Sequence, residues 1–162
     1  MQMITHFLVG IIIQKFLFEI IPFPFDIILI LILAFLSHIL LDCLARLTYH
    51  TPEPQKGDKI WLGWHIVIYV TSFLVFIIFC NPYWLVMIVS ILFDIWDWYT
   101  LRMIQRHIKK DPNWGKKYFL HPIIDKVRSK FFMWLPDLTY NHKGILVEVV
   151  IIISLLCIIL FL

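Results

Sequence analysis

The sequence predicts an all-α protein: a polytopic integral membrane helical bundle with about five transmembrane helices and one interfacial amphipathic segment. Hydrophobic residues make up 61% of its 162 residues and charged residues only 15%, and the mean hydropathy is +0.87. Soluble domains are much less apolar than this. Because a spanning helix takes roughly 20 apolar residues, about five of them use up the chain, which indicates a single transmembrane domain over residues 1–162.

Five apolar stretches are each long enough to cross the hydrocarbon core of a bilayer as a helix. Proline residues separate the first two stretches and also the third and fourth, so both connections should be very short turns on the same side. The N-terminus and the longer connections should then lie on the opposite side. The predicted spans are about 5–22, 26–47, 60–80, 83–105 and 143–162.

The basic residues indicate which side faces the cytoplasm. All but one of the 14 Lys and Arg residues lie on or near the side with the long connections, and the exception, Lys15, lies inside the first predicted span. By the positive-inside rule, that side and the N-terminus should be cytoplasmic and the C-terminus outside. Residues 106–134 mix lysines with Trp, Tyr and Phe, which predicts a segment lying on the membrane surface, with a short amphipathic helix over 122–133.

Histidines and carboxylates recur inside the predicted spans, where ionisable groups are costly and usually functional. His38 and Asp42 are four residues apart, so they share one face of the second span, and Asp94 and Asp97 similarly share a face of the fourth. When the spans are traced through the membrane, each contributes such a group at a similar depth in the cytoplasmic leaflet. The full set is His6, His38, Asp42, His65, Asp94, Asp97, His142 and Glu148.

This set of side chains predicts a divalent metal site. Neutral imidazole and carboxylate oxygen are the usual ligands of zinc, manganese and iron where thiolates are absent, and we expect zinc first. Carboxylates packed together in a low dielectric repel each other unless a cation neutralises them. The expected ligands are His6, His38, Asp42, Asp94, Asp97 and His65, with His142 and Glu148 as general acid and base.

Several of these residues also have a purely structural interpretation. His38 and Asp42 can form a helix-packing pair, and Asp42 can instead pair with Arg46 one turn later. His65 can be an interfacial histidine next to Trp64, and Asp97 a hydrated neighbour of the flanking tryptophans. His121 precedes Pro122 in the interfacial segment, and whether it folds over the site is left open.

Two motifs resemble those of a known family. Thr5-His6-Phe7-Leu8-Val9-Gly10 and Leu36-Ser37-His38-Ile39-Leu40-Leu41-Asp42 are similar to the THxxxG and SHxLLD signatures of the YdjM-like family of membrane-bound metal-dependent hydrolases. His50 resembles the histidine that often follows the second motif. The resemblance covers mainly residues 5–50 and implies metal-dependent hydrolysis, with His6, His38 and Asp42 as carried-over ligands and Asp94 and His142 as weaker ones.

The sequence therefore leads to the hypothesis of a metal-dependent membrane hydrolase that acts on an ester or phosphoester of a lipid-like substrate at the cytoplasmic leaflet. Its partners would be membrane lipids, no nucleic acid is expected, and a homo-oligomer remains open. Two other classes stay in view: an ion- or proton-relay or transport protein, and a noncatalytic membrane assembly subunit. The sequence has no Gly-rich phosphate loop, nucleophile elbow or HExxH motif, which argues against nucleotide hydrolysis, serine-hydrolase chemistry and zincin proteolysis.

Overall fold

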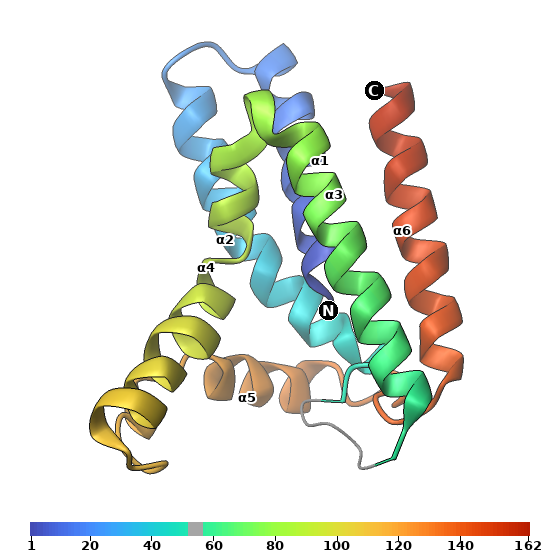
Figure 1. Ribbon diagram of the computed structural model, residues 1–162. Helices are drawn as coiled ribbons and strands as arrows, with labels where there is room; N and C mark the ends of the chain where they lie inside the picture. The colour runs from blue at the N-terminus through green and yellow to red at the C-terminus, as the bar shows by residue number, and fades with distance from the viewer. Residues whose placement is uncertain (52–56) are drawn as a thin grey trace.

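The computed structural model describes residues 1–51 and 57–162, and the elements within these ranges are all helical. Four helices are long and apolar enough to cross a membrane, which fits an integral membrane protein. They form an upright bundle, and α5 lies across its lower end (Figure 1). The four are α1 (Met3–Ile20), α2 (Phe25–Leu44, continued by the 3₁₀ turn η1, Ala45–Leu47), α3 (Lys59–Ser90) and α6 (Lys143–Phe161).

The ends of these helices follow from local sequence. The chain leaves α1 at Ile21 with extended backbone and turns through the segment that contains Pro22 and Pro24. Asp58 caps α3, because its carboxylate accepts hydrogen bonds from the backbone N–H groups of Ile60 and Trp61 at 2.9 and 3.0 Å. Both short turns and the C-terminus lie at the upper end of the bundle in Figure 1.

The region predicted as the third and fourth spans is a hairpin whose second arm is interrupted. Asn81 and Pro82 have non-helical backbone angles inside α3, so the helix folds back there. The second arm breaks again at Ile91 and continues as α4 (Leu92–Asp94) and the π-helical segments η2 (Ile95–Leu101) and η3 (Ile104–Lys109). The predicted span 83–105 is therefore not one continuous α-helix, because the chain changes its winding at Ile91.

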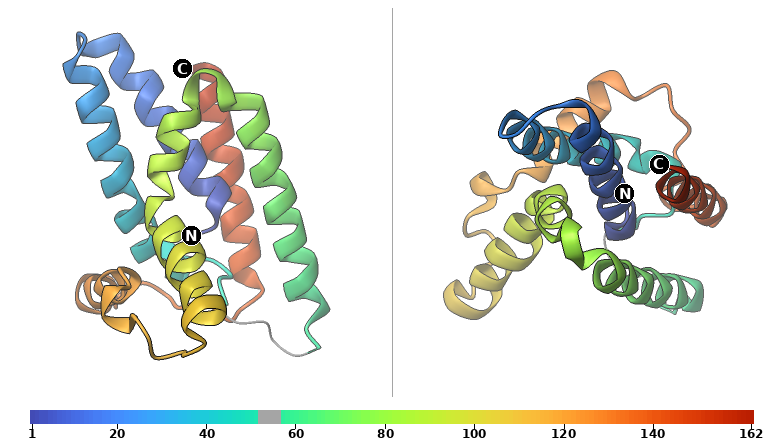
Figure 2. Two further views of the ribbon diagram at one scale, coloured as in Figure 1. Left: turned by 60° about the vertical axis from the view of Figure 1, so that its left-hand side comes forward. Right: turned by 90° about the horizontal axis from the view of Figure 1, so that it is seen from above.

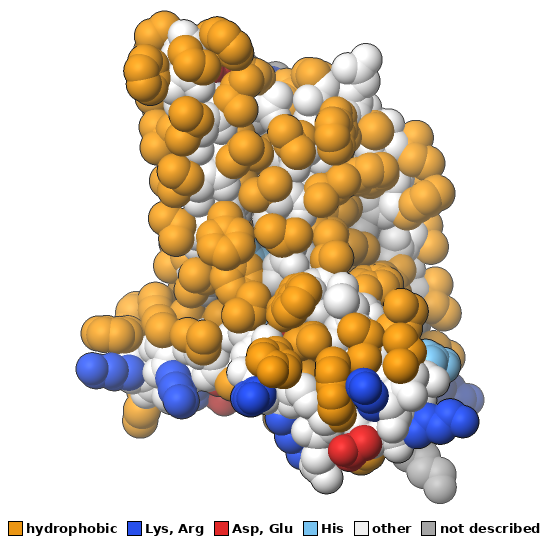
Figure 3. Space-filling model, turned by 90° about the vertical axis from the view of Figure 1, so that its left-hand side faces the viewer, with side chains coloured by type: hydrophobic (Ala, Val, Ile, Leu, Met, Phe, Trp, Pro, Cys, Tyr) orange, Lys and Arg blue, Asp and Glu red, His pale blue; other side chains and the backbone are white. Residues whose placement is uncertain are grey.

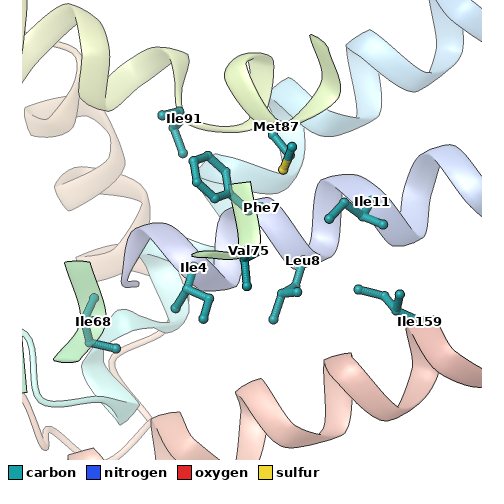
Figure 4. Packing of buried hydrophobic residues seen from close by; sticks show 9 residues of the cluster. All are labelled: Ile4, Phe7, Leu8, Ile11, Ile68, Val75, Met87, Ile91 and Ile159. Carbon is teal, nitrogen blue, oxygen red and sulfur yellow. The ribbon is translucent and has the colours of Figure 1, made fainter. Parts of the chain in front are cut away.

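Helix α1 lies at the centre of the bundle. It contacts α2, α3 and α6, and its buried residues Ile4, Phe7, Leu8 and Ile11 pack against α3 and α6. Figure 4 shows these side chains facing Ile68, Val75, Met87, Ile91 and Ile159. The outer surface of the bundle is also apolar: in Figure 3, hydrophobic side chains cover the upper body, and the Lys and Arg side chains gather at the lower end.

The connection between the hairpin and α6 wraps around the lower end. It contains the 3₁₀ turn η4 (Lys116–Tyr118) and α5 (His121–Phe131), close to the predicted amphipathic helix 122–133. Pro122 stands in the first turn of α5, where its missing N–H costs no hydrogen bond. Buried Ile124 packs against Cys43 of α2 and Phe93 of α4. This packing holds the first turn of α5 against the lower half of the bundle (Figure 2).

Candidate metal centre

Four side chains from three parts of the chain converge where α5 meets α2. His38 and Asp42 come from α2, Asp94 from α4 and His121 from the start of α5, and one ligand atom of each lies within 4.8 Å of the other three. Asp42 Oδ2 is 3.2 Å from His38 Nε2 and 3.2 Å from His121 Nε2, and His121 Nε2 is 3.3 Å from Asp94 Oδ1. The geometry can hold one metal ion with two imidazole and two carboxylate ligands.

The carbonyl group of Ser90 determines which ring nitrogen of His38 carries the hydrogen. His38 Nδ1 lies 2.8 Å from the carbonyl oxygen of Ser90, and because a carbonyl only accepts, this nitrogen must carry the hydrogen. The lone pair of a neutral ring is then on Nε2, which is buried, has no hydrogen-bond partner among the described residues and faces Asp42. Two lone pairs facing each other are unfavourable unless a proton or metal ion lies between them.

The Ser90 carbonyl is available because the second arm of the hairpin breaks at Ile91. Ser90 is the last residue of α3, and Ile91 has backbone angles outside the α-helix (φ −115°, ψ 16°). The carbonyl of Ser90 is therefore available to His38 at the point where the helix stops. Hydrogen bonding of a ligand histidine through its other nitrogen to a backbone carbonyl is the common arrangement in metal sites.

Asp97 orients His121. The Asp97 carboxylate is fully buried and accepts hydrogen bonds from His121 Nδ1 at 2.7 Å and from the backbone N–H groups of Leu120 and His121 at 2.8–3.0 Å. These bonds fix the start of α5 and turn His121 Nε2 toward Asp42 and Asp94. Asp97, predicted as a direct ligand, thus lies behind the candidate ligand His121, in the position that the carboxylate has in a carboxylate–histidine–metal arrangement.

The carboxylates make a strongly negative environment around His121. Burial disfavours the charged ring, but its hydrogen bonds to Asp42, Asp94 and Asp97 outweigh this and raise the pKa of His121 to about 11. The potential that holds a proton on this ring also favours a divalent cation at the same place.

His6 adds a third imidazole beside the cluster. Its Nε2 is 3.2 Å from Asp42 Oδ1, and its ring stacks on His38 with centroids 4.3 Å apart. The side chain is fully buried, and neither ring nitrogen has a hydrogen-bond partner within the described ranges. The ammonium group of Met1 also lies 2.6 Å from Asp42 Oδ1. Asp42 is therefore the carboxylate around which the polar groups gather.

Three of the predicted site residues lie elsewhere. Fully buried Glu148 accepts a hydrogen bond from Thr5 at 2.8 Å, between α6 and α1. His142 is half exposed, 3.5 Å from Asp58 and edge-on to the Tyr49 ring. His65 is bonded to the carbonyl of Trp61 and stacks on its ring. The structure places none of these three within the four-residue cluster, although His65 lines an adjoining cavity.

Two cavities meet at the cluster and share Asp42, His50, Trp98 and His121 among their lining residues. The larger, about 590 Å³, lies along α5 and is also lined by Arg46 and Arg128. The smaller, about 310 Å³, lies between the N-terminal residues, α3 and η2, and includes Asp94 and His65. The cluster is therefore reachable from two sides.

His50, like His121, was not among the ligands expected from the sequence. It lines both cavities, and its Nδ1 is buried without a hydrogen-bond partner in the described part of the chain. Burial lowers the pKa of His50 to about 3, so the ring is neutral at physiological pH. His50 thus faces the same space as the candidate ligands Asp42 and His121.

In comparisons with known proteins, no family model, no curated protein and no solved structure matches this chain. The class that its fold and site define is therefore a helical protein with four helices able to span a membrane and a His and Asp cluster that can hold a metal ion.

The orienting role of Asp97 leads to a testable expectation. Asp97→Asn keeps the size of the side chain but removes the charge behind His121, so zinc affinity should fall about 10–100-fold, as for other residues behind metal ligands. Titration of metal-free protein with zinc against a chromophoric chelator measures this. Asp111→Asn is the matched control, because Asp111 is an exposed carboxylate that caps a nearby turn through the Asn113 N–H. An unchanged affinity in Asp97→Asn would show that Asp97 acts only in folding.

Proposed function

We propose that this protein is a metal-dependent membrane hydrolase that cleaves an ester or phosphoester of an anionic, lipid-like substrate. The observation that carries the proposal is the convergence of His38, Asp42, Asp94 and His121 ligand atoms within 4.8 Å at the junction of two cavities. Imidazole and carboxylate donors in this ratio suit zinc best, with manganese and iron as alternatives.

The apolar perimeter supports insertion in a membrane. Many large hydrophobic side chains on the long helices are exposed, which is costly in water and favourable in lipid. With both arms of the Asn81-Pro82 hairpin inserted, the chain would cross five times. The Lys and Arg residues gather at the lower end (Figure 3), so the positive-inside rule favours a cytoplasmic site and an external C-terminus.

A divalent ion held by these side chains would supply an acidified water and polarise the bond to be cleaved. The protein contributes positioning: Asp97 directs His121, and the Ser90 carbonyl directs His38. His50 offers a neutral imidazole at the junction of the cavities. The resemblance of residues 5–50 to the YdjM-like hydrolases agrees with this proposal, because the three carried-over residues, His6, His38 and Asp42, are neighbours here.

The guanidinium groups of the larger cavity offer donors to an anionic substrate. Arg46 is 3.3 Å from Asp137, and Arg128 is paired with Asp125, and all four residues line the cavity. Arg46 Nε is buried and has no hydrogen-bond partner among the described residues. Guanidinium forks match carboxylate and phosphate oxygens. A substrate with a phosphate or carboxylate next to the reacting bond would therefore be held between these arginines and the metal.

The proposal is tested by hydrolysis and metal analysis on one preparation. Purified protein is given dioleoyl phosphatidic acid, dioleoyl phosphatidylglycerol and a fatty acyl ester, before and after treatment with a chelator, and released products are quantified. We expect one of these to be cleaved, with activity lost on chelation and restored by zinc, manganese or iron. The His38→Ala, Asp42→Ala double variant should lose both metal and activity, whereas His107→Ala, at an exposed histidine, should lose neither.

Hydrolysis that survives chelation or the double variant would contradict the metal-dependent mechanism. Stoichiometric metal with no cleavage of any of the three bond types would contradict the assignment as a hydrolase.

A noncatalytic assembly subunit remains the second candidate. The observation that favours it is that Asp42 and Asp94 both pair with His121. These two ion pairs are sufficient to join α2, α4 and α5 without a metal. This alternative predicts a purified protein without stoichiometric metal, and loss of a partner protein when the His38 and Asp42 face is replaced.

A further inference from the structure

An apolar groove runs between α3 and α6, above the polar cluster. Both helices pack against α1, and the view from above shows them on adjacent sides of it (Figure 2). The space between them, about 290 Å³, is lined almost entirely by hydrophobic side chains, including Val67 and Leu74 of α3, Val149 and Ile153 of α6, and Ile4 of α1. Its lining residues belong to three of the helices that are able to span a membrane.

The groove adjoins the smaller polar cavity. Ile68 lines both spaces, and the first residues of the chain form a wall of each: Met3 borders the polar cavity and Ile4, the next residue, borders the groove. The polar cavity in turn contains Asp94 and His121 of the candidate metal centre. The apolar groove therefore borders the cavity that contains these two side chains.

Beyond the cluster the lining contains guanidinium groups and their carboxylate partners. The smaller cavity shares four lining residues with the larger one, where Arg46 and Arg128 are located together with Asp137 and Asp125. Arg46 Nε is buried and has no hydrogen-bond partner among the described residues, so this guanidinium keeps a donor for an anionic group. From the groove to α5, the lining therefore changes from hydrocarbon to imidazole, carboxylate and guanidinium. A molecule that complements this sequence has an apolar chain at one end and an anionic group at the other, with its polar bonds between them.

The lining of the groove and its position beside the polar cavity favour a hydrocarbon chain over a helix of a second copy. Thr71 is the one polar residue among those that line the groove, and Ile68 also lines the cavity that contains Asp94 and His121. A helix of a second copy would cover the groove without bringing a polar group to those residues. A membrane lipid has an apolar chain and a polar headgroup in one molecule, so it can complement both spaces.

We propose that the protein binds one anionic membrane lipid, with a fatty chain between α3 and α6 and its headgroup at the junction of the two cavities beside His121. This inference rests on the proposed function, since the bound lipid is the substrate class of the hydrolase. It adds that recognition requires both the chain and the anion, and that the substrate enters sideways from the bilayer.

Binding of dioleoyl phosphatidic acid to delipidated protein in detergent, measured by native mass spectrometry, tests the proposal. Wild-type protein should bind one lipid per chain. Val67→Trp fills the groove and should weaken binding at least 10-fold. Val70→Trp is the matched control, because Val70 is on the same helix, is similarly exposed (52% against 50%) and does not line the groove, so its binding should be unchanged. Ile153→Trp and Val150→Trp repeat the comparison on α6, with exposures of 55% and 56%.

Two further probes separate the chain from the headgroup. Dioleoylglycerol, which has the chains without the phosphate, and glycerol 3-phosphate, which has the phosphate without the chains, should each bind at least 10-fold more weakly than the complete lipid. Binding of either probe as tight as that of phosphatidic acid would overturn the proposal. A dimer of the wild-type protein that dissociates in Val67→Trp, with no bound lipid, would also overturn it and assign the groove to a second copy.

Metal analysis of the same samples separates this proposal from the proposed function. Val67→Trp should keep its metal and melt at the temperature of Val70→Trp, since the groove lies outside the ligand set. Lipid binding that follows the expected pattern in a protein without stoichiometric metal would support the lipid site and contradict the hydrolase. Stoichiometric metal with no bound phosphatidic acid in wild-type protein would overturn the lipid site alone.

Discussion

Replacement of Asp42 by asparagine is expected to abolish stoichiometric metal binding. Asp42 is the only residue within 3.2 Å of His6, His38 and His121 together in the described part of the chain, so its charge neutralises any cation held among them. Asparagine keeps the volume of the side chain but removes that charge, and the affinity for zinc should fall at least about 100-fold, beyond the range seen for residues behind a ligand. Elemental analysis of the purified variant measures the loss.

Asp26→Asn provides the control for the Asp42 variant. Asp26 is likewise a buried aspartate of α2, but it stands at the first turn of the helix, at the end away from the cluster. Its replacement should leave the metal content unchanged. Equal metal content in Asp42→Asn and wild-type protein would remove Asp42 from the site.

Replacement of Gly144 by alanine is expected to destabilise the fold strongly. A methyl group at Gly144 would lie 2.4 Å from the backbone N of Tyr49, 2.6 Å from the carbonyl carbon of Thr48 and 3.0 Å from the carbonyl oxygen of Leu138. These are backbone atoms, which cannot move aside as a flexible side chain can. The start of α6 must shift, which should cost about 1–3 kcal/mol or more, and the melting temperature should fall.

Gly63→Ala is the matched control, because it is the same substitution in α3 at a site with open space around the added methyl group. Alanine is the better helix former by about 1 kcal/mol, so this variant should melt at or above the temperature of the wild type. Equal melting temperatures for Gly144→Ala and Gly63→Ala would contradict the close packing of α6 against residues 48–49.

The long helices were predictable because their signal is local. An apolar run of about 20 residues identifies a helix such as α2 or α6 whatever its neighbours are, and the prolines mark the turns. The break at Ile91 was not predictable in this way. Residues 91–101 are still mainly apolar and aromatic and contain no proline or glycine, and the change to π-helix accompanies contacts with α2 and with the start of α5 that lie far away in the sequence.

The site was predictable where helical periodicity brings residues together. His38 and Asp42 are one turn apart on α2, and their side chains meet as the i, i+4 spacing requires. His6 and Asp94 were placed near them by their depth in the predicted spans and by the family resemblance; in the structure Asp94 is part of the cluster and His6 lies beside it. Depth along a helix says nothing about which way a side chain faces, however, and for this reason Glu148 and His142 belong to a different set of contacts.

His121 depends on tertiary structure that no short-range pattern encodes. It follows a long irregular connection, and its position is set by the hydrogen bonds that Asp97, 24 residues earlier, accepts from the backbone N–H groups of Leu120 and His121 and from His121 Nδ1, and by the packing of Ile124. The sequence contained one signal: a histidine directly before a proline in the first turn of an amphipathic helix. That pattern locates the helix, but not the surface against which the helix packs.

X-ray absorption spectroscopy of the zinc-loaded protein tests whether His38, Asp42, Asp94 and His121 hold a metal ion. We expect one zinc per chain, with two imidazole nitrogens and two carboxylate oxygens at about 2.0–2.2 Å, and loss of one imidazole from the spectrum in His38→Ala. Zinc that binds substoichiometrically, or a zinc spectrum with oxygen ligands only and no change in His38→Ala, would contradict the assignment of His38, Asp42, Asp94 and His121 as a metal centre.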